Sequence, residues 1–198
     1  KHEDQIEKTL KESVLAIFSK KNINNKIIYN KIVTNILYNH KDMNKILISA
    51  TTNNEGKDEF VEEVARTIAE KGNNILVIDV DRGLSENNEI KKIMEVEDVN
   101  KLIIKKEYDL LSINNDSLSE DNIKKLFISL DGKYQYILIN GTPINNGVLS
   151  QCFAKEVDGT IYIVKGYKNK RKVVLRSINE LKAYNSNIIG IVLNNIEA

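Results

Sequence analysis

The stretch ILISATTNNEGKDEF, residues 46–60, indicates the fold class of this chain. An apolar, strand-like segment at 46–50 leads through a polar loop into a helical pattern that starts at Phe60. The loop carries a Gly-Lys pair, Gly56 and Lys57, just before the helix. Backbone N–H groups at a helix N-terminus and a nearby lysine favour a bound phosphate. The order of strand, loop, Gly-Lys and helix therefore predicts a phosphate-binding loop.

Further along the chain, short apolar segments alternate with helical patterns. The expected strands are ILVID, YDLLSI, YILIN, TIYIV and IIGIVLN, at residues 75–79, 108–113, 136–140, 160–164 and 188–194. The expected helices span residues 60–72, 89–96, 99–105, 117–132 and 168–184. The fourth should be capped by Ser117, and the last should bury Val173, Val174, Ile178 and Leu181. Short apolar strands separated by helices predict an α/β fold: a doubly wound, mostly parallel sheet with helices on both faces.

Two apolar patterns precede the first of these strands. Residues 3–19 carry apolar side chains at helical spacing, namely Ile6, Leu10, Val14 and Ile17. A second helical run follows, so we expect a helical extension over residues 1–26 and a main domain over residues 27–198. The stripe of the first helix most simply packs on the core. A junction to a membrane-spanning partner and a self-association surface are the alternatives.

Charge and cysteine content exclude several classes of function. The 198 residues include 29 Lys and Arg and 28 Asp and Glu, so the net charge of +1 gives no electrostatic reason to expect nucleic acid as a partner. The single cysteine, Cys152, excludes an internal disulfide framework and a cysteine-rich zinc site. No apolar stretch reaches the about 18 residues that span a membrane, and no signal-peptide pattern is present, so we expect a cytoplasmic protein.

Polar residues stand at the ends of two further buried strands. Asp79 and Asp81 follow ILVID, where two carboxylates can share a Mg²⁺ ion or polarise a nucleophile, although helix-capping turns use the same residues. Asn140 ends YILIN and is followed by Gly-Thr-Pro. Ligands of parallel α/β sheets bind at the carboxyl ends of the strands. We therefore expect these side chains to lie beside the loop of Lys57.

In this order the three sites resemble the bacterial tyrosine kinases of capsule and exopolysaccharide biosynthesis (BY-kinases), which are related to the Min and Par branch of P-loop ATPases. The family patterns TSxxPGEGKST, LLIDxDxR and YDYIIIDTPP correspond here to SATTNNEGKDE, LVIDVDRG and YQYILINGTP. The pattern ADGTILVVRxxxTxRxxVxxAxxxLxxxxxxxxGxVLN corresponds to VDGTIYIVKGYKNKRKVVLRSINELKAYNSNIIGIVLN. The resemblance covers about residues 27–195 and implies a doubly wound P-loop NTPase fold.

The resemblance implies a site for ATP or ADP with Mg²⁺. The implied nucleotide-contacting residues are Asn54, Glu55, Gly56, Lys57, Asp58, Glu59, Asn140 and Asn194, the last of them near the adenine. The implied catalytic residues are Lys57, Asp79 and Asp81, and the implied metal ligands are Asp58, Asp79 and Asp81. The implied partner is a membrane-spanning polysaccharide co-polymerase, fused or separate. Family members also form homo-oligomeric rings.

Two departures from the family pattern affect the Mg²⁺ site. Asp58 replaces the Ser or Thr whose hydroxyl binds the metal, and Asn140 replaces an aspartate that organises it. Of the ring-forming motif ExxRxxxxN only the last position, Asn35, is kept. We therefore predict a weak or inactive kinase that regulates or scaffolds capsule or exopolysaccharide export at the inner face of the cell membrane.

Two alternatives stay open. The first is an active, autophosphorylating tyrosine kinase that uses Asp58 directly as a metal ligand. The second is a Min/Par-type positioning ATPase. Proteins of that type usually carry a further lysine early in the loop, and the matching position here is Thr52, which counts against this alternative.

Overall fold

The computed structural model describes residues 8, 11–19, 21–22, 24–52, 56–80, 99, 102–113, 118–144, 148–165, 171–185 and 187–194. Within these ranges the strands are β1 (Val14–Phe18), β2 (Lys45–Ala50), β3 (Ile75–Asp79), β4 (Ile104–Lys105), β5 (Asp109–Ser112), β6 (Tyr136–Asn140), β7 (Gly159–Lys165) and β8 (Ile188–Asn194). The helices with defined bounds are α2 (Lys26–Asn39), α3 (Lys57–Glu70), α5 (Glu120–Leu130), α6 (Leu149–Glu156) and α7 (Arg171–Tyr184).

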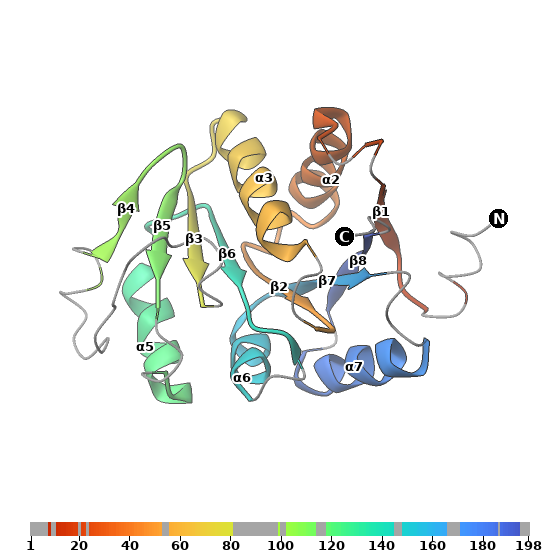
Figure 1. Cartoon of the computed structure of the whole chain (residues 1–198). Coiled ribbons are helices and arrows are strands. Elements are labelled where there is room, and N and C mark those ends of the chain that lie inside the picture. The colour runs from red at the N-terminus through yellow and green to blue at the C-terminus, as the bar shows by residue number, and fades with distance from the viewer. Residues whose placement is uncertain are drawn as a thin grey trace.

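The sheet is wound in both directions from its centre. Its strand order is β1-β8-β7-β2-β6-β3-β5-β4, and the described pairs are parallel except for β4 with β5. After β2 the chain passes through α3 to β3 on one side, whereas β7 and β8 lie on the other side of β2 (Figure 1). The predicted doubly wound, mostly parallel α/β fold is confirmed.

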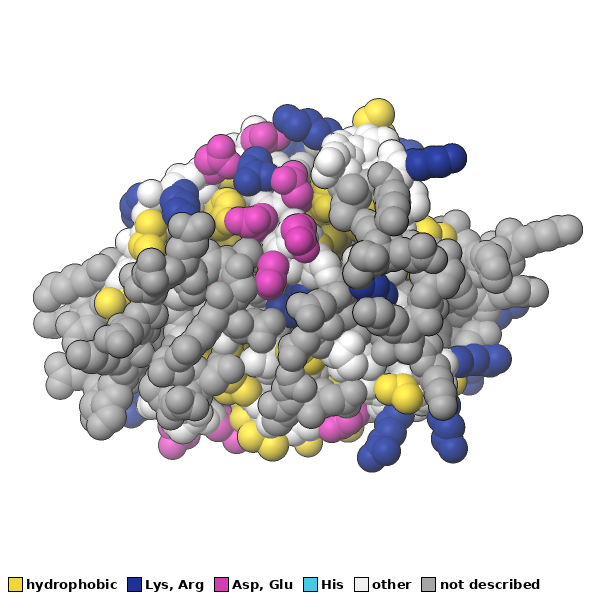
Figure 2. All heavy atoms as spheres, viewed as in Figure 1, with side chains coloured by type: hydrophobic (Ala, Val, Ile, Leu, Met, Phe, Trp, Pro, Cys, Tyr) yellow, Lys and Arg dark blue, Asp and Glu magenta, His cyan; other side chains and the backbone are white. Residues whose placement is uncertain are grey.

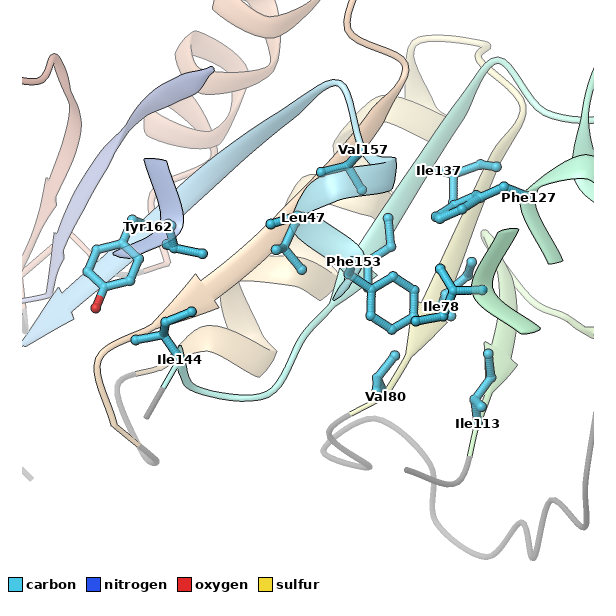
Figure 3. Packing of buried hydrophobic residues seen from close by; sticks show 14 of the residues in the cluster. Leu47, Ile78, Val80, Ile113, Phe127, Ile137, Ile144, Phe153, Val157 and Tyr162 are labelled. Carbon is cyan, nitrogen blue, oxygen red and sulfur yellow. The ribbon is translucent and has the colours of Figure 1, made fainter. Parts of the chain in front are cut away.

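Helices cover both faces of this sheet. α2 and α3 pack on one face, and α5, α6 and α7 pack on the other (Figure 1). In β2, Ile46, Ile48 and Ala50 belong to the α2–α3 core, whereas Leu47 belongs to the opposite core with Phe153 of α6 (Figure 3). Because alternate residues of a strand point to opposite faces, a strand covered on both faces is apolar throughout. None of the helices in the described ranges is long and apolar enough to cross a membrane.

The helix expected over residues 3–19 is wrong for residues 14–18, which form β1. This strand runs parallel to β8, with Val14 opposite Ile191 and Phe18 opposite Asn194. A five-residue apolar run fits a strand and a helix equally well by periodicity, so the open edge of β8 decides the outcome. The boundary expected at residue 26 would separate β1 from the sheet that it extends. Ile6 and Leu10 of the expected stripe lie outside the described residues.

Other local expectations also differ from the structure. Ile104 and Lys105 form β4, so the helix expected over residues 99–105 is wrong at its end. Ser119, not Ser117, caps α5, because its side chain accepts a hydrogen bond from the backbone N–H of Asn122 at 3.2 Å. Ser117 and the helix expected over residues 89–96 lie outside the described residues.

The C-terminal half differs from expectation in two helices. In α7, Val174, Ile178 and Leu181 are buried as predicted, but Val173 is exposed. The short helix α6 was not expected at all. Its buried residues, Ser150, Phe153 and Ala154, have the i, i+3, i+4 spacing that would have located it.

Asp158 ties the start of β2 to the turn before β7. Its Oδ2 accepts hydrogen bonds from the backbone N–H groups of Asn44 at 2.9 Å and Lys45 at 2.8 Å. Hydrogen bonds to a charged group contribute more than neutral ones, so Asp158→Ala is expected to lower the free energy of unfolding by about 1–3 kcal/mol in a urea titration. Asp42→Ala, at an exposed turn position nearby, is the control and should change it by less than about 0.5 kcal/mol. Equal losses in the two variants would contradict this role.

Candidate nucleotide-binding site

The loop after β2 and the ends of β3 and β6 meet at the carboxyl edge of the sheet. β6 pairs with both β2 and β3, and Asn140 at its end stands opposite Asp79. Gly56 is the N-cap of α3, so Lys57 and Asp58 occupy the first turn of that helix. The structure thereby brings together predicted site residues from three separate segments.

Asn140 is the centre of a hydrogen-bond network. Its Oδ1 accepts a hydrogen bond from Lys57 Nζ at 2.5 Å. Its Nδ2 donates to Asp58 Oδ1 at 2.9 Å and to Asp79 Oδ1 at 3.0 Å. Lys57 Nζ also lies 3.4 Å from Asp58 Oδ1. One uncharged amide therefore contacts the lysine and both carboxylates.

Most of this network is buried. Asp79 and Asn140 have no exposed surface, and Lys57 is 5% exposed. The side chain of Asp58 is 39% exposed and forms the solvent side of the network. Burying a charged group is costly unless it is paired and hydrogen-bonded. Asn140 contributes to that pairing because it gives Lys57 an acceptor and Asp79 a donor.

The ends of β7 and β8 lie beside the same loop. Gly56 has a φ of +77°, and a Cβ at this position would lie 2.4 Å from Asn194 Nδ2. Asn194, which the resemblance places near a nucleotide base, is therefore packed against the loop. Lys165 stands opposite Asn194 on the β7–β8 ladder and is 7% exposed. Sequence reasoning missed Lys165, although a lysine that ends the apolar strand TIYIVK was a usable signal.

Buried hydroxyl groups support the backbone on both sides of the network. Tyr162 donates a hydrogen bond to Thr51 Oγ1 at 2.8 Å, directly after β2. Ser49 donates to the carbonyl of Thr142 at 3.2 Å, and Ser150 of α6 donates to the same carbonyl. Tyr162 and Thr51, and likewise Ser49 and Thr142, are far apart in the sequence, so no local pattern predicted these contacts. They connect the loops after β2 and β6 to the rest of the core.

Acidic side chains cover the first turns of α3. Figure 2 shows Asp and Glu side chains gathered over this helix, whose sequence includes Asp58, Glu59, Glu62 and Glu63. Burial, followed by the carboxylates of Glu63 and Glu59, raises the pKa of Tyr29 to about 12. Carboxylates are favourable at a helix N-terminus, but they repel a phosphate that binds there. These carboxylates therefore reduce the attraction that Lys57 and the N-terminus of α3 offer to an anionic ligand at the loop.

The carboxylates as placed do not fit a Mg²⁺ ion shared through their Oδ1 atoms. Asp58 and Asp79 each direct Oδ1 at Nδ2 of Asn140, so the amide lies between the two implied ligands. Mg²⁺ binds oxygen ligands in near-octahedral geometry, and an amide NH₂ group is a donor that cannot ligate it. In the described part of the chain, no group of three or more His, Cys, Asp or Glu side chains could hold a metal ion. Asn54, Glu55 and Asp81 lie outside the described residues.

Comparison with known proteins identifies chains that resemble this one in sequence and in fold. No protein-family model matches the chain. It is 23% identical over 188 residues to tyrosine-protein kinase CpsD of Streptococcus agalactiae serotype III, a match that covers 85% of this chain and 81% of that protein. The solved structure of the chimerical protein CapA2B2 has a TM-score of 0.80 at 18% identity and covers 99% of this chain and 100% of that one. The kinase domain of Escherichia coli tyrosine kinase ETK has a TM-score of 0.78 at 16% identity, with 95% and 93% covered.

Sequence and fold therefore agree on the relatives of this protein. The match to tyrosine-protein kinase CpsD spans most of both chains, and the two solved structures cover 99% and 95% of this chain. The predicted resemblance to the bacterial tyrosine kinases is confirmed, and the chain has the P-loop NTPase fold of their kinase domains.

Proposed function

We propose that this protein is a BY-kinase-like domain with weak or no kinase activity, which regulates or scaffolds capsule or exopolysaccharide biosynthesis and export. The observation that carries the proposal is the contact of the Asn140 amide with Lys57, Asp58 and Asp79, where the family pattern has a metal-organising carboxylate. Phosphoryl transfer is accelerated almost entirely by positioned charge and metal. Losing one preorganised oxyanion-hole donor costs about 2.7–4 kcal/mol, or roughly 10²–10³ in rate, and we expect a loss on this scale here.

Binding of ATP or ADP is part of the proposal, at reduced affinity. Lys57 and the N-terminal turn of α3 would hold the phosphates, and Asn194 would lie toward the base. Asp58 and Glu59 in the same turn oppose the phosphates. Nucleotide binding at this site would therefore stabilise one conformation of the domain more readily than it would lead to phosphoryl transfer.

The proposed partner is a membrane-spanning polysaccharide co-polymerase, fused to this chain or separate, which would hold the domain at the cytoplasmic face of the membrane. The resemblance to BY-kinases supports this, as does the similarity to tyrosine-protein kinase CpsD. Homo-oligomer formation through α2 is also proposed, because Ile27 and Tyr38 of that helix are largely exposed.

An autophosphorylation assay with ATP and Mg²⁺ tests the proposed loss of activity. The chain is expected to incorporate no more phosphate on tyrosine than Lys57→Ala does, while the Escherichia coli ETK kinase domain, assayed beside it, is active. The reason is that the amide of Asn140 stands where a metal-organising charge is required. Robust phosphorylation that Lys57→Ala abolishes would refute the proposal.

The second candidate is an active tyrosine kinase that uses Asp58 as a metal ligand. The 39% exposure of the Asp58 side chain favours it, because the carboxylate can reach a ligand from the solvent side. Under this candidate Asp58→Ala abolishes activity. If the site is instead degraded, Asp58→Ser should raise activity by restoring a hydroxyl at the position where the family pattern has one.

A further inference from the structure

The orientation of the Asn140 side chain is determined by its three partners. An asparagine amide has two donor protons on Nδ2 and an acceptor on Oδ1. Here Oδ1 faces the Lys57 ammonium, and Nδ2 faces the carboxylates of Asp58 and Asp79. The reversed orientation would direct protons at an ammonium and an oxygen at two carboxylates, and all three contacts would be repulsive. Both Nδ2 protons are therefore engaged between the two aspartates.

Asp58 and Asn140 both differ from the family pattern that the chain resembles, and the two differences offset each other in charge. That pattern has a hydroxyl at position 58 and a carboxylate at position 140. Counted with Lys57 and Asp79, both arrangements carry a formal charge of −1. Compared with the family pattern, this chain has a carboxylate in the partly exposed first turn of α3, where the helix dipole favours it, and none at the buried end of β6. The uncharged amide of Asn140 occupies that buried position instead.

We propose that the Asn140 amide takes the place of a divalent cation at this site, so that the loop binds a nucleoside di- or triphosphate without Mg²⁺. The inference rests on the proposed nucleotide site and adds that this site requires no metal ion. The two Nδ2 protons link Asp58 to Asp79. A cation shared by these carboxylates would make the same link. A cation that took the place of Nδ2 between these two Oδ1 atoms would have to break both hydrogen bonds in a region where unpaired polar groups are costly.

A second lysine adds positive charge for a polyphosphate that arrives without a metal. β7 pairs with β2 up to Ile163 opposite Ala50, and Lys165 lies two residues further toward the loop. It also stands opposite Asn194, whose Nδ2 packs against Gly56. Lys165 at the end of β7 and Lys57 in the first turn of α3 thus both lie near the loop, and both are nearly buried. Charges attract phosphate more strongly at such positions than in open solvent.

Calorimetric titration of the full chain with ADP and with ATP, in Mg²⁺ and in excess EDTA, tests the proposal. The dissociation constants of the wild type in the two buffers are expected to agree within about threefold. Lys165→Gln is expected to weaken binding in EDTA by about tenfold. A wild type whose binding Mg²⁺ tightens by about tenfold or more would overturn the proposal, as would no binding at millimolar nucleotide.

The double variant Asp58→Ser/Asn140→Asp is the matched control, because it restores the family arrangement at unchanged formal charge. It is expected to bind nucleotide about tenfold more tightly in Mg²⁺ than in EDTA. Asn140→Asp alone places three carboxylates together and should bind Mn²⁺, measured without nucleotide, while unfolding at a lower temperature than the wild type. If that single variant folds poorly, the double variant still decides: equal binding in both buffers would overturn the proposal.

The outcomes separate this inference from the proposed function. Metal-independent binding together with strong tyrosine phosphorylation would refute the weak-kinase proposal and leave the role of Asn140 standing. Metal-dependent binding without tyrosine phosphorylation would refute the proposed role of Asn140 and leave the weak-kinase proposal standing.

Discussion

Gly56→Ala is expected to lower the free energy of unfolding by about 2–5 kcal/mol and to distort the loop that carries Lys57. Two costs add at this position. The backbone has a φ of +77°, which a residue with a Cβ adopts at a cost of roughly 1–2 kcal/mol. The new Cβ would also lie 2.4 Å from Nδ2 of Asn194, so this nearly buried side chain would have to shift. Overpacking of this kind adds roughly 1–3 kcal/mol.

Gly72→Ala is the matched control for this prediction. Gly72 has a φ of +84°, but a Cβ there would meet nothing within 4 Å, so only the backbone cost remains. Urea unfolding of both variants should give a smaller loss for Gly72→Ala, and Asn194→Ala should recover part of the loss in Gly56→Ala. Equal losses in the two glycine variants would show that Asn194 does not restrain the loop.

Phe153→Ala is expected to lower the free energy of unfolding by about 3–5 kcal/mol. Phe153 has no exposed surface and packs edge-to-face on Phe127, with ring centroids 6.2 Å apart at 88° (Figure 3). It joins α6 to the side of the sheet that contains Leu47. Removing the ring takes away its transfer free energy and leaves a cavity that the surrounding helices and strands fill only in part. Urea or thermal unfolding measures the effect.

Ile128→Ala provides the comparison for Phe153→Ala. Ile128 lies on α5 and is 75% exposed, so its truncation should change the free energy of unfolding by less than about 0.5 kcal/mol. Similar losses in the two variants would mean that the core on this face of the sheet is not packed around Phe153.

The central strands were predictable because both of their faces are covered. The strands expected at residues 75–79, 136–140 and 188–194 have the same bounds as β3, β6 and β8. Each is a continuous apolar run that ends at a polar residue, which is the pattern of a buried parallel strand. α3 was predictable for a related reason. Its apolar residues Phe60, Val64 and Ile68 recur at helical spacing and are buried against the sheet.

Elements at the edges of the fold were harder to predict, because a neighbour decides them. β1 is a five-residue strand only because β8 offers it a free edge, and Gly190 leaves space for Leu15 beside it. β4 has two residues and forms through its antiparallel partner β5. Short segments such as these have too few residues for a period to distinguish strand from helix.

Several parts of the candidate site could be located from the residues alone: a Gly-Lys loop before a helix, an aspartate at the end of β3 and an asparagine at the end of β6. The position of the asparagine amide between the two carboxylates and the position of Lys165 beside the loop could be seen only in the folded chain. These contacts were not predictable because their partners are far apart along the chain. The contacts of Asn140 with Asp79 and Lys57 join residues 61 and 83 positions apart, so they depend on strand order and register, which no local interaction specifies.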